Sequence, residues 1–321
     1  MFSISDAWVW DFWLADDGER SHLFFLHAPK SLGDPDARHH HATIGHAVST
    51  DLVTWERRPD VVSKGQPGEA DDLATWTGSI VQGDDRLWYL FYTSTRLTTA
   101  GVVQTISVVT SSDLETFTKV PGPLLRAATP HYERLSESFG QDEAFRDPWV
   151  FRDATGTGWH MLITARTPSG PRFDRGVVGH ATSVDLRTWT LQPPLSRGGQ
   201  GFGHLEVMEP LELGGRHFLM FNCLAADMPE ARRPHTTGGT WVARAAGPLG
   251  PYDITGAELL TDDRYYVTRP IHERGTGRVL LMAFRNKDAD GRFVGELTDP
   301  VELALVDGRP RIVGPAADEW T

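Results

Sequence analysis

The chain of 321 residues carries 43 acidic and 31 basic side chains, which gives a net charge of -12, and 40% of its residues are hydrophobic. This excess of negative charge argues against a nucleic-acid backbone or an anionic membrane surface as a partner and favours a small neutral ligand. The single cysteine, Cys223, excludes an intrachain disulfide and is typical of a protein from a reducing compartment.

The N-terminal stretch MFSISDAWVWDFWLADD has no basic segment followed by an apolar one, so it does not resemble a secretory signal. No apolar stretch is long enough to cross a bilayer as a helix. We therefore expect a cytoplasmic protein that has no membrane segment.

Five apolar, strand-like runs recur along the chain at intervals of roughly 60 residues. They are HLFFLH at 22–27, LWYLFYTS at 87–94, WHMLITAR at 159–166, HFLMFNC at 217–223 and RVLLMAFR at 278–285. Gly, Pro and Asp turns fill the intervals, and no helical periodicity is sustained. A second, weaker sequence repeat, the Ser-Asp echo, consists of STDLVTW, SSDLETF and SVDLRTW, which begin at Ser49, Ser111 and Ser183.

Each interval has room for one four-stranded sheet, and five such sheets placed radially form a β-propeller with an axial channel. The sequence thus predicts an all-β fold, a five-bladed β-propeller with four antiparallel strands per blade. The alternative, a β-sandwich, would not explain a five-fold recurrence. Because no linker-like stretch interrupts the repeats, we expect a single domain over residues 1–321.

Three acidic residues occupy nearly the same place in three of the repeats, just upstream of the apolar run. They are Asp11, Asp147 and Glu206. If each apolar run is the second strand of a blade, these residues lie on the innermost strands and converge on the axis. Glycoside hydrolysis uses such a set, because one carboxylic acid protonates the leaving oxygen while a carboxylate attacks the sugar or activates water.

The neighbours of these acids predict different protonation states. Arg146 is expected to keep Asp147 ionised, whereas the apolar neighbours of Glu206 are expected to raise its pKa and make it the general acid. Glu209 competes for that role, but it is three residues further along a strand and should face the other side.

Other residues on the predicted inner strands are candidates for binding the sugar. They are Trp10, Trp13, Trp76, Ser79, Arg146, Arg269 and His272. The segment Arg38-His39-His40-His41 is interpreted as a loop at the substrate rim, because consecutive side chains alternate in direction and cannot easily share one metal ion. We expect neither a metal nor a cofactor. His46 and His180 occupy matching repeat positions, which indicates a role in blade packing.

Several segments in the same order resemble glycoside hydrolase family 32, the fructosidases and invertases. They are IGHAVSTDLVTWE at 44–56, TGSIVQGDDRLWYLFYTS at 77–94, FRDPWVF at 145–151, HLEVMEPLEL at 204–213 and FVGELTDPVEL at 293–303. The resemblance implies a five-bladed catalytic propeller that acts on fructofuranosides with retention of configuration. It implies that Asp11 is the nucleophile, that Glu206 is the acid/base and that Asp147, helped by Arg146, stabilises the transition state.

The sequence departs from the family pattern in two places. The nucleophile of the family stands in an Asn-Asp-Pro-Asn-Gly context, whereas here it stands in Trp10-Asp11-Phe12-Trp13-Leu14. The chain also ends soon after the propeller, without the C-terminal β-sandwich usual in the family, which suggests the hypothesis of a homo-oligomer that covers this flank.

The sequence leaves four functions open, each with a small carbohydrate as ligand. The first is an exo-acting hydrolase of a small fructofuranoside or related furanoside. The alternatives are an inverting arabinofuranosidase or xylosidase similar to family 43, a fructosyltransferase, and a non-catalytic sugar-binding propeller.

Overall fold

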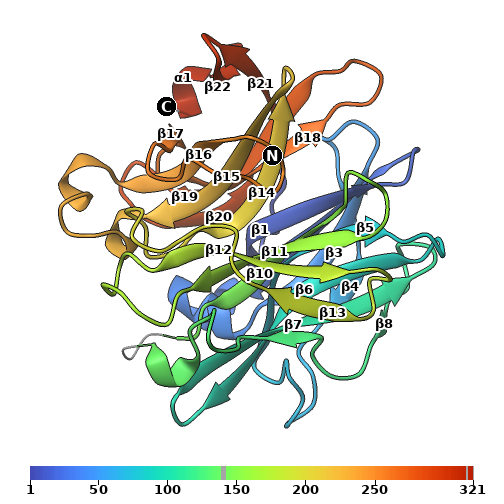
Figure 1. The fold of residues 1–321 in the computed structure, drawn as a ribbon. Coiled ribbons are helices and arrows are strands. Elements are labelled where there is room, and N and C mark those ends of the chain that lie inside the picture. The colour runs from blue at the N-terminus through green and yellow to red at the C-terminus, as the bar shows by residue number, and fades with distance from the viewer. Residues whose placement is uncertain (139–141, 316, 321) are drawn as a thin grey trace.

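Five antiparallel sheets surround a common axis and account for nearly all regular structure in the computed structural model, which describes residues 1–138, 142–315 and 317–320 (Figure 1). The predicted five-bladed β-propeller is therefore confirmed. The five apolar runs of the sequence form the second strand of each blade, as predicted. None of the helices in the described part of the chain is long and apolar enough to span a membrane.

The first two blades use residues 7–126. Blade one consists of β1 (Ala7–Asp16), β2 (Ser21–Pro29), β3 (Thr43–Ser49) and β4 (Glu56–Val62). Blade two consists of β5 (Ala74–Gln82), β6 (Trp88–Thr98), β7 (Gly101–Ser111) and β8 (Thr118–Lys119), and β9 (Leu125–Arg126) also pairs with β7.

The remaining blades follow in chain order. Blade three consists of β10 (Phe145–Arg152), β11 (Trp159–Arg166), β12 (Gly176–Ser183) and β13 (Trp189–Gln192). Blade four consists of β14 (Glu206–Leu213), β15 (Arg216–Leu224), β16 (Gly238–Ala245) and β17 (Glu258–Thr261). Blade five consists of β18 (Tyr265–His272), β19 (Val279–Lys287), β21 (Val301–Val306) and β22 (Arg309–Val313), and β20 (Phe293–Leu297) also pairs with β19.

Short helices lie in the connections between these strands and after the last strand. The 3-10 helices are η1 (Lys30–Leu32), η2 (Pro35–His40), η3 (Leu135–Glu137), η4 (Ala225–Asp227) and η5 (Arg233–His235), and α1 (Ala317–Trp320) follows the last strand. Of these, η2 is important for the site, because it carries Arg38 and His39 from the β2–β3 connection toward the axis.

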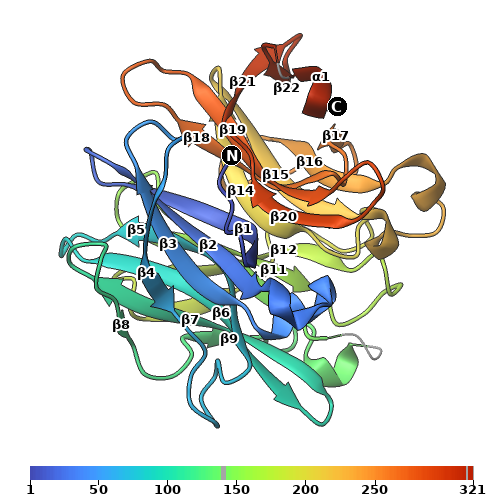
Figure 2. The ribbon, with the colours of Figure 1, turned by 180° about the vertical axis from the view of Figure 1, so that it is seen from behind.

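The N-terminal residues close the ring of blades. The backbone of Phe2 exchanges two hydrogen bonds with that of Leu297 in β20, at 3.0 and 2.9 Å, so the first residues extend the sheet of blade five. The Phe2 ring also packs against Phe25 of blade one, with ring centroids 4.8 Å apart. Figures 1 and 2 show the result: blade one, in blue, lies beside the orange and red strands of blade five.

The buried apolar residues gather between neighbouring blades. The largest cluster joins blades one, two and five, and three further clusters fill the contacts between blades two and three, three and four, and four and five. Packing between blades thus stabilises the ring.

The turns predicted from the Ser-Asp echo share one geometry. The side-chain oxygen of Ser49, Ser111 or Ser183 accepts a hydrogen bond at 2.9 Å from the backbone N–H of the leucine three residues later. Each of these leucines has a positive φ, between 61 and 63°. The echo therefore marks a structural turn that joins the third and fourth strands of a blade.

Every inner strand contains a β-bulge at nearly the same height. The pairing register shifts between Trp10 and Phe12 in β1, Trp76 and Gly78 in β5, Arg146 and Trp149 in β10, Glu206 and Glu209 in β14, and Tyr266 and Arg269 in β18. A bulge adds one residue to its strand and redirects the side chains beyond it. Residues on either side of the bulge consequently face different ends of the channel.

Candidate active site

The three predicted carboxyl groups line one cavity of about 420 Å³ at one end of the axis. Asp11 comes from β1, Asp147 from β10 and Glu206 from β14. The predicted binding residues Trp10, Trp76 and Arg146 line the same cavity. Asp11 and Asp147 lie within bulges, whereas Glu206 directly precedes one.

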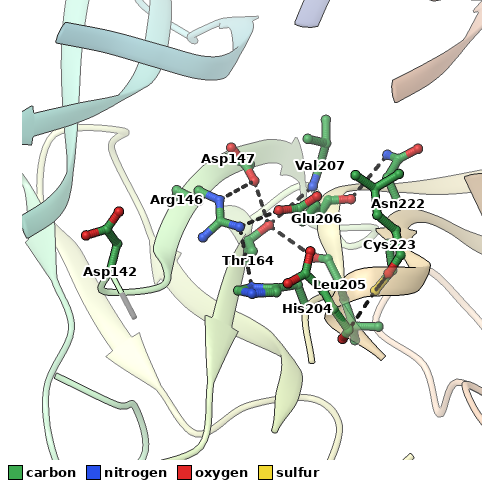
Figure 3. Close-up of polar contacts among 12 residues, drawn as sticks. Asp142, Arg146, Asp147, Thr164, His204, Leu205, Glu206, Val207, Asn222 and Cys223 are labelled. Carbon is green, nitrogen blue, oxygen red and sulfur yellow. Dashed lines mark hydrogen bonds and ion pairs between the residues drawn. The ribbon is translucent and has the colours of Figure 1, made fainter. Parts of the chain in front are cut away.

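Arg146 links two of the three acids. Its Nη2 donates to Glu206 Oε1 at 2.5 Å, and its Nε lies 3.4 Å from Asp147 Oδ2 (Figure 3). The same Nη2 is 3.4 Å from His204 Nδ1. Burial alone would lower the pKa of Arg146, but the charges of Glu206 and Asp147 raise it above its usual value. Arg146 is therefore a fixed cation between the two acids.

Glu206 has polar surroundings, so the expectation of an apolar environment is wrong. Besides Arg146, the hydroxyl of Tyr266 donates to its Oε2 at 2.6 Å. Glu209, the competitor in the sequence, faces another hollow and forms an ion pair with Arg269. Glu206 and Glu209 pair with residues of β15 that are two apart, Asn222 and Met220, so the bulge cancels the strand alternation assumed from the sequence. The two glutamates are instead separated along the strand and line different hollows.

Asp147 is buried, with 5% of its surface exposed, and its backbone φ is 56°. Thr164 donates its hydroxyl to Oδ2 at 2.9 Å. Burial raises the pKa of Asp147 to about 7; Arg146 lowers it less than burial raises it, and the charges of Asp11 and Glu206 add to the rise. Arg146 thus favours the ionised form of Asp147, as expected from the sequence, but burial and the two neighbouring acids outweigh it.

Asp11 accepts a hydrogen bond at Oδ2 from the hydroxyl of Thr77, on the neighbouring inner strand β5. Burial raises the pKa of Asp11, the charge of Glu206 adds to this rise, and Thr77, Arg269 and Arg38 oppose it. The ionisation of Asp11 thus depends on a balance among groups from several elements.

Several cavity residues were not singled out from the sequence as site residues. They include Tyr266, His204, Gln104, Glu143, Arg166, Asp227 and Asn286. Tyr266 could have been found, because it precedes the bulge of β18 as Arg146 and Glu206 precede theirs. Burial raises the pKa of Glu143 to about 7 and that of Asp227 to about 6, so the cavity holds further carboxyl groups that titrate near neutral pH.

The segment Arg38-His39-His40-His41 divides between the cavity and solvent. Arg38 and His39 line the cavity, and Trp76 donates its indole N–H to the backbone carbonyl of His39 at 2.6 Å. His40 and His41 are exposed. Within the described residues, no group of three or more His, Cys, Asp or Glu side chains is arranged to hold a metal ion.

Four predicted binding residues lie away from this cavity. Trp13, Arg269 and His272 line a second hollow of about 500 Å³, which also contains Glu209. Ser79 is buried, and its side-chain oxygen accepts a hydrogen bond at 3.0 Å from the backbone N–H of Val150 in the next blade. The first three lie beyond the bulges of β1 and β18, further along the inner strands than the residues that line the first cavity.

Comparisons with known proteins agree with this architecture. The family model described as the glycosyl hydrolases family 32 N-terminal domain matches residues 14–246. The chain is 28% identical over 214 residues to the sucrose-6-phosphate hydrolase of Escherichia coli, covering 64% of this chain and 39% of that protein. It is 29% identical over 304 residues to the raffinose invertase of Escherichia coli, covering 90% of this chain and 58% of that protein. The chain thus spans less than two thirds of either relative.

A solved structure extends the comparison to nearly the whole chain. The inulosucrase from Halalkalicoccus jeotgali bound to kestose superposes with a TM-score of 0.81 at 26% identity. The match covers 97% of this chain and 88% of the inulosucrase chain.

Proposed function

The chain belongs to glycosyl hydrolase family 32, and on that premise we propose that it is a retaining glycoside hydrolase that removes a terminal fructose or related furanose from a small sugar. The observation that carries the proposal is the convergence of Asp11, Asp147 and Glu206 in one cavity. Three neighbouring carboxyl groups repel one another when ionised, and glycoside hydrolysis is a reaction that uses such an arrangement.

The first step forms a covalent intermediate. Glu206, in its protonated form, gives its proton to the glycosidic oxygen while the Asp11 carboxylate attacks the anomeric carbon. The bond between that carbon and the leaving oxygen breaks, and the leaving sugar departs as a neutral alcohol. Arg146 and Asp147 are placed to bind hydroxyl groups of the furanose ring as positive charge develops on it.

The second step releases the sugar. Glu206, now ionised, takes a proton from water, and the water oxygen attacks the anomeric carbon and displaces Asp11. Tyr266 donates to Glu206 Oε2 and Arg146 donates to Oε1, so both oxygens of the ionised form that this step requires are held in place.

Hydrolysis of a panel of aryl furanosides and small sugars, sucrose included, tests the proposal. We expect the wild type to release fructose or another furanose, and Asp11→Asn and Glu206→Ala to lower kcat by orders of magnitude. Asp16→Asn, an exposed carboxyl change in the same strand, is the control and should keep wild-type activity. Activity toward sucrose that survives either site variant would contradict the assignment of that acid.

The leaving group and the product anomer give two independent checks of the roles. Glu206→Ala should keep more activity toward a 4-nitrophenyl furanoside than toward sucrose, because a good leaving group does not need the proton. Asp11→Asn should lose both activities equally. Carbon-13 NMR of the first-formed anomer should show retention, and an inverted product would exclude Asp11 as a covalent nucleophile.

Fructosyl transfer is a second candidate, supported by the likeness to the inulosucrase bound to kestose. Transfer and hydrolysis use the same intermediate and differ in whether a sugar or water attacks it. Product analysis at high sucrose concentration separates the two, because a transferase forms trisaccharides whereas a hydrolase forms fructose and glucose in equal amounts.

A further inference from the structure

Arg269 joins four of the five inner strands at one point on the axis. It lies in β18, and its Nε donates to the carbonyl of Phe12 in β1 at 3.0 Å. Its Nη1 donates to Glu209 Oε2 in β14 at 3.0 Å, and its guanidinium lies 4.6 Å from the centre of the Trp149 ring in β10. Only 3% of its surface is exposed. These contacts fix the side chain in one position inside the ring.

The contact with Phe12 bears directly on Asp11. Phe12 follows Asp11 in the chain, and the bulge of β1 lies between Trp10 and Phe12. A bulged residue is left out of the ladder of hydrogen bonds, so its direction depends on how its neighbours are held. By holding the Phe12 carbonyl, Arg269 fixes one end of the segment that presents Asp11 to the cavity.

The charge of Arg269 also acts on Asp11. Two acids face Asp11, Glu206 from β14 and Asp147 from β10, and both oppose a second negative charge. Arg38 from η2 and Arg269 from β18 are the cations that favour its ionised form, and Thr77 from β5 adds a hydrogen bond.

Arg269 lines the second hollow rather than the catalytic cavity, so its side chain reaches the Asp11 segment from the far side of the bulge. A nucleophilic carboxylate must be ionised to attack, and its geometry must be fixed to within a fraction of an ångström.

We propose that Arg269 is a positioning residue for the nucleophile, which fixes the Asp11 bulge and supplies a positive charge behind it without touching the sugar. The proposal rests on the proposed role of Asp11. It assigns to Arg269 a function other than the substrate contact expected from the sequence, because its guanidinium is engaged by Phe12, Glu209 and Trp149.

The test separates the charge of Arg269 from its contacts. Arg269→Met alone would leave Glu209 buried without its partner, so it is combined with Glu209→Gln, and Arg269→Lys keeps the charge. Arg285→Met is the matched control, because Arg285 lies in the next strand of blade five and pairs with Glu296. Circular dichroism and thermal unfolding of each variant establish that it is folded.

The first readout is the pKa of Asp11, measured by NMR titration of carbon-13-labelled aspartate with Asp11→Asn to assign the resonance. We expect the pKa to rise by about one unit in the double variant, because a nearby cation is removed, and to stay near the wild-type value in Arg269→Lys and Arg285→Met. An unchanged pKa in the folded double variant would overturn the electrostatic part of the proposal. This readout does not depend on turnover, so it tests Arg269 even if the wild type cleaves none of the furanosides.

The second readout is steady-state kinetics on the furanoside that the wild type cleaves. Arg269→Lys loses the fork of hydrogen bonds, so we expect kcat to fall about tenfold or more while KM changes by less than about twofold. A raised KM with an unchanged kcat would instead indicate a substrate contact and overturn the proposal. An inactive wild type would contradict the proposed function and leave the NMR result to decide on Arg269.

Discussion

At the scale of single residues, the site depends on the β-bulge that inserts one additional residue into each inner strand. Asp147 adopts a φ of 56°, as do Val207 and Val267 at 51° and 48° in the neighbouring blades. Such a backbone is uncommon for residues other than glycine and is kept only where the surrounding structure imposes it. The ring of bulges is therefore a built feature that directs Asp11, Asp147 and Glu206 into one cavity.

The hydroxyl of Thr77 is expected to tune Asp11. The hydrogen bond from Thr77 to Oδ2 lowers the pKa of Asp11 in the wild type, and Thr77→Val removes it. We therefore expect the pKa of Asp11 to rise and the acidic limb of the kcat/KM profile to move to higher pH. Thr77→Ser keeps the hydroxyl and serves as the control. A pH profile measured on the best furanoside gives the answer, and coincident profiles for Val and Ser would refute the role of this hydrogen bond.

At the scale of elements, a buried ion cluster ties the connection before blade three to the second and third strands of that blade. Glu133 contacts Arg166 of β11 at 2.6 Å and Arg175, just before β12, at 2.5 Å. All three side chains are 1% exposed or less. Arg166 also lines the catalytic cavity, so the ion pair with Glu133 holds one wall of that cavity in place.

Glu133→Gln should destabilise the protein by about 3–5 kcal/mol, because it leaves buried arginine charge without its carboxylate. Urea unfolding followed by tryptophan fluorescence measures the loss. Glu115→Gln, a change of a partly exposed carboxyl, is the control and should cost no more than about 0.5 kcal/mol. Equal midpoints for the two variants would show that the buried cluster contributes little.

A pair of stacked histidines recurs in blades one and three. The ring nitrogens of His22 and His46 are 3.0 Å apart, as are those of His160 and His180. The pKa of His46 is lowered to about 3 and that of His180 to about 4, chiefly by burial and also by the charge of the partner histidine. The sequence interpretation of His46 and His180 as packing residues agrees with these contacts.

These pKa values predict a loss of stability in acid. An unfolded histidine titrates near pH 6.5, so between that pH and the folded value the unfolded chain binds more protons and the free energy of unfolding falls as the pH decreases. The slope is up to about 1.4 kcal/mol per pH unit for each histidine. Urea unfolding at several pH values between 7 and 4.5 should show a flatter dependence in a His46→Gln, His180→Gln double variant, and an unchanged slope would contradict the assignment.

At the scale of the whole molecule, the ring closes through residues from both ends of the chain. Phe2 pairs with Leu297 of blade five and packs on Phe25 of blade one, so it holds the first and last blades together. Closing a ring in this way protects strand edges that would otherwise be free to pair with other chains.

Phe2→Ala should lower the free energy of unfolding by about 3 kcal/mol, because a buried aromatic ring is lost at the closure. Activity measured well below the unfolding temperature should remain close to that of the wild type, since Phe2 does not line the catalytic cavity. Thermal unfolding makes the comparison, with Ser3→Ala at an exposed neighbouring position as the control. A similar melting temperature for both variants would mean that other contacts close the ring.

The sequence by itself determined the number of blades and the three acidic residues that converge on the axis. Each blade has an apolar second strand that is buried on both faces, and this local pattern recurs as runs such as HLFFLH and WHMLITAR, which can be read without a structure. The position of Asp11, Asp147 and Glu206 upstream of these runs was also sufficient to predict that they converge, because the repeat places them on inner strands.

Only the tertiary structure decided which end of the channel each side chain faces and how the acids are charged. The bulges change the alternation expected for regular strands, and Trp13, Arg269 and His272, which follow the bulges, line a different hollow from Trp10 and Asp11. Burial and ion pairing are properties of groups from different blades, and for that reason the neighbours of Glu206 in the chain did not reveal Arg146 and Tyr266.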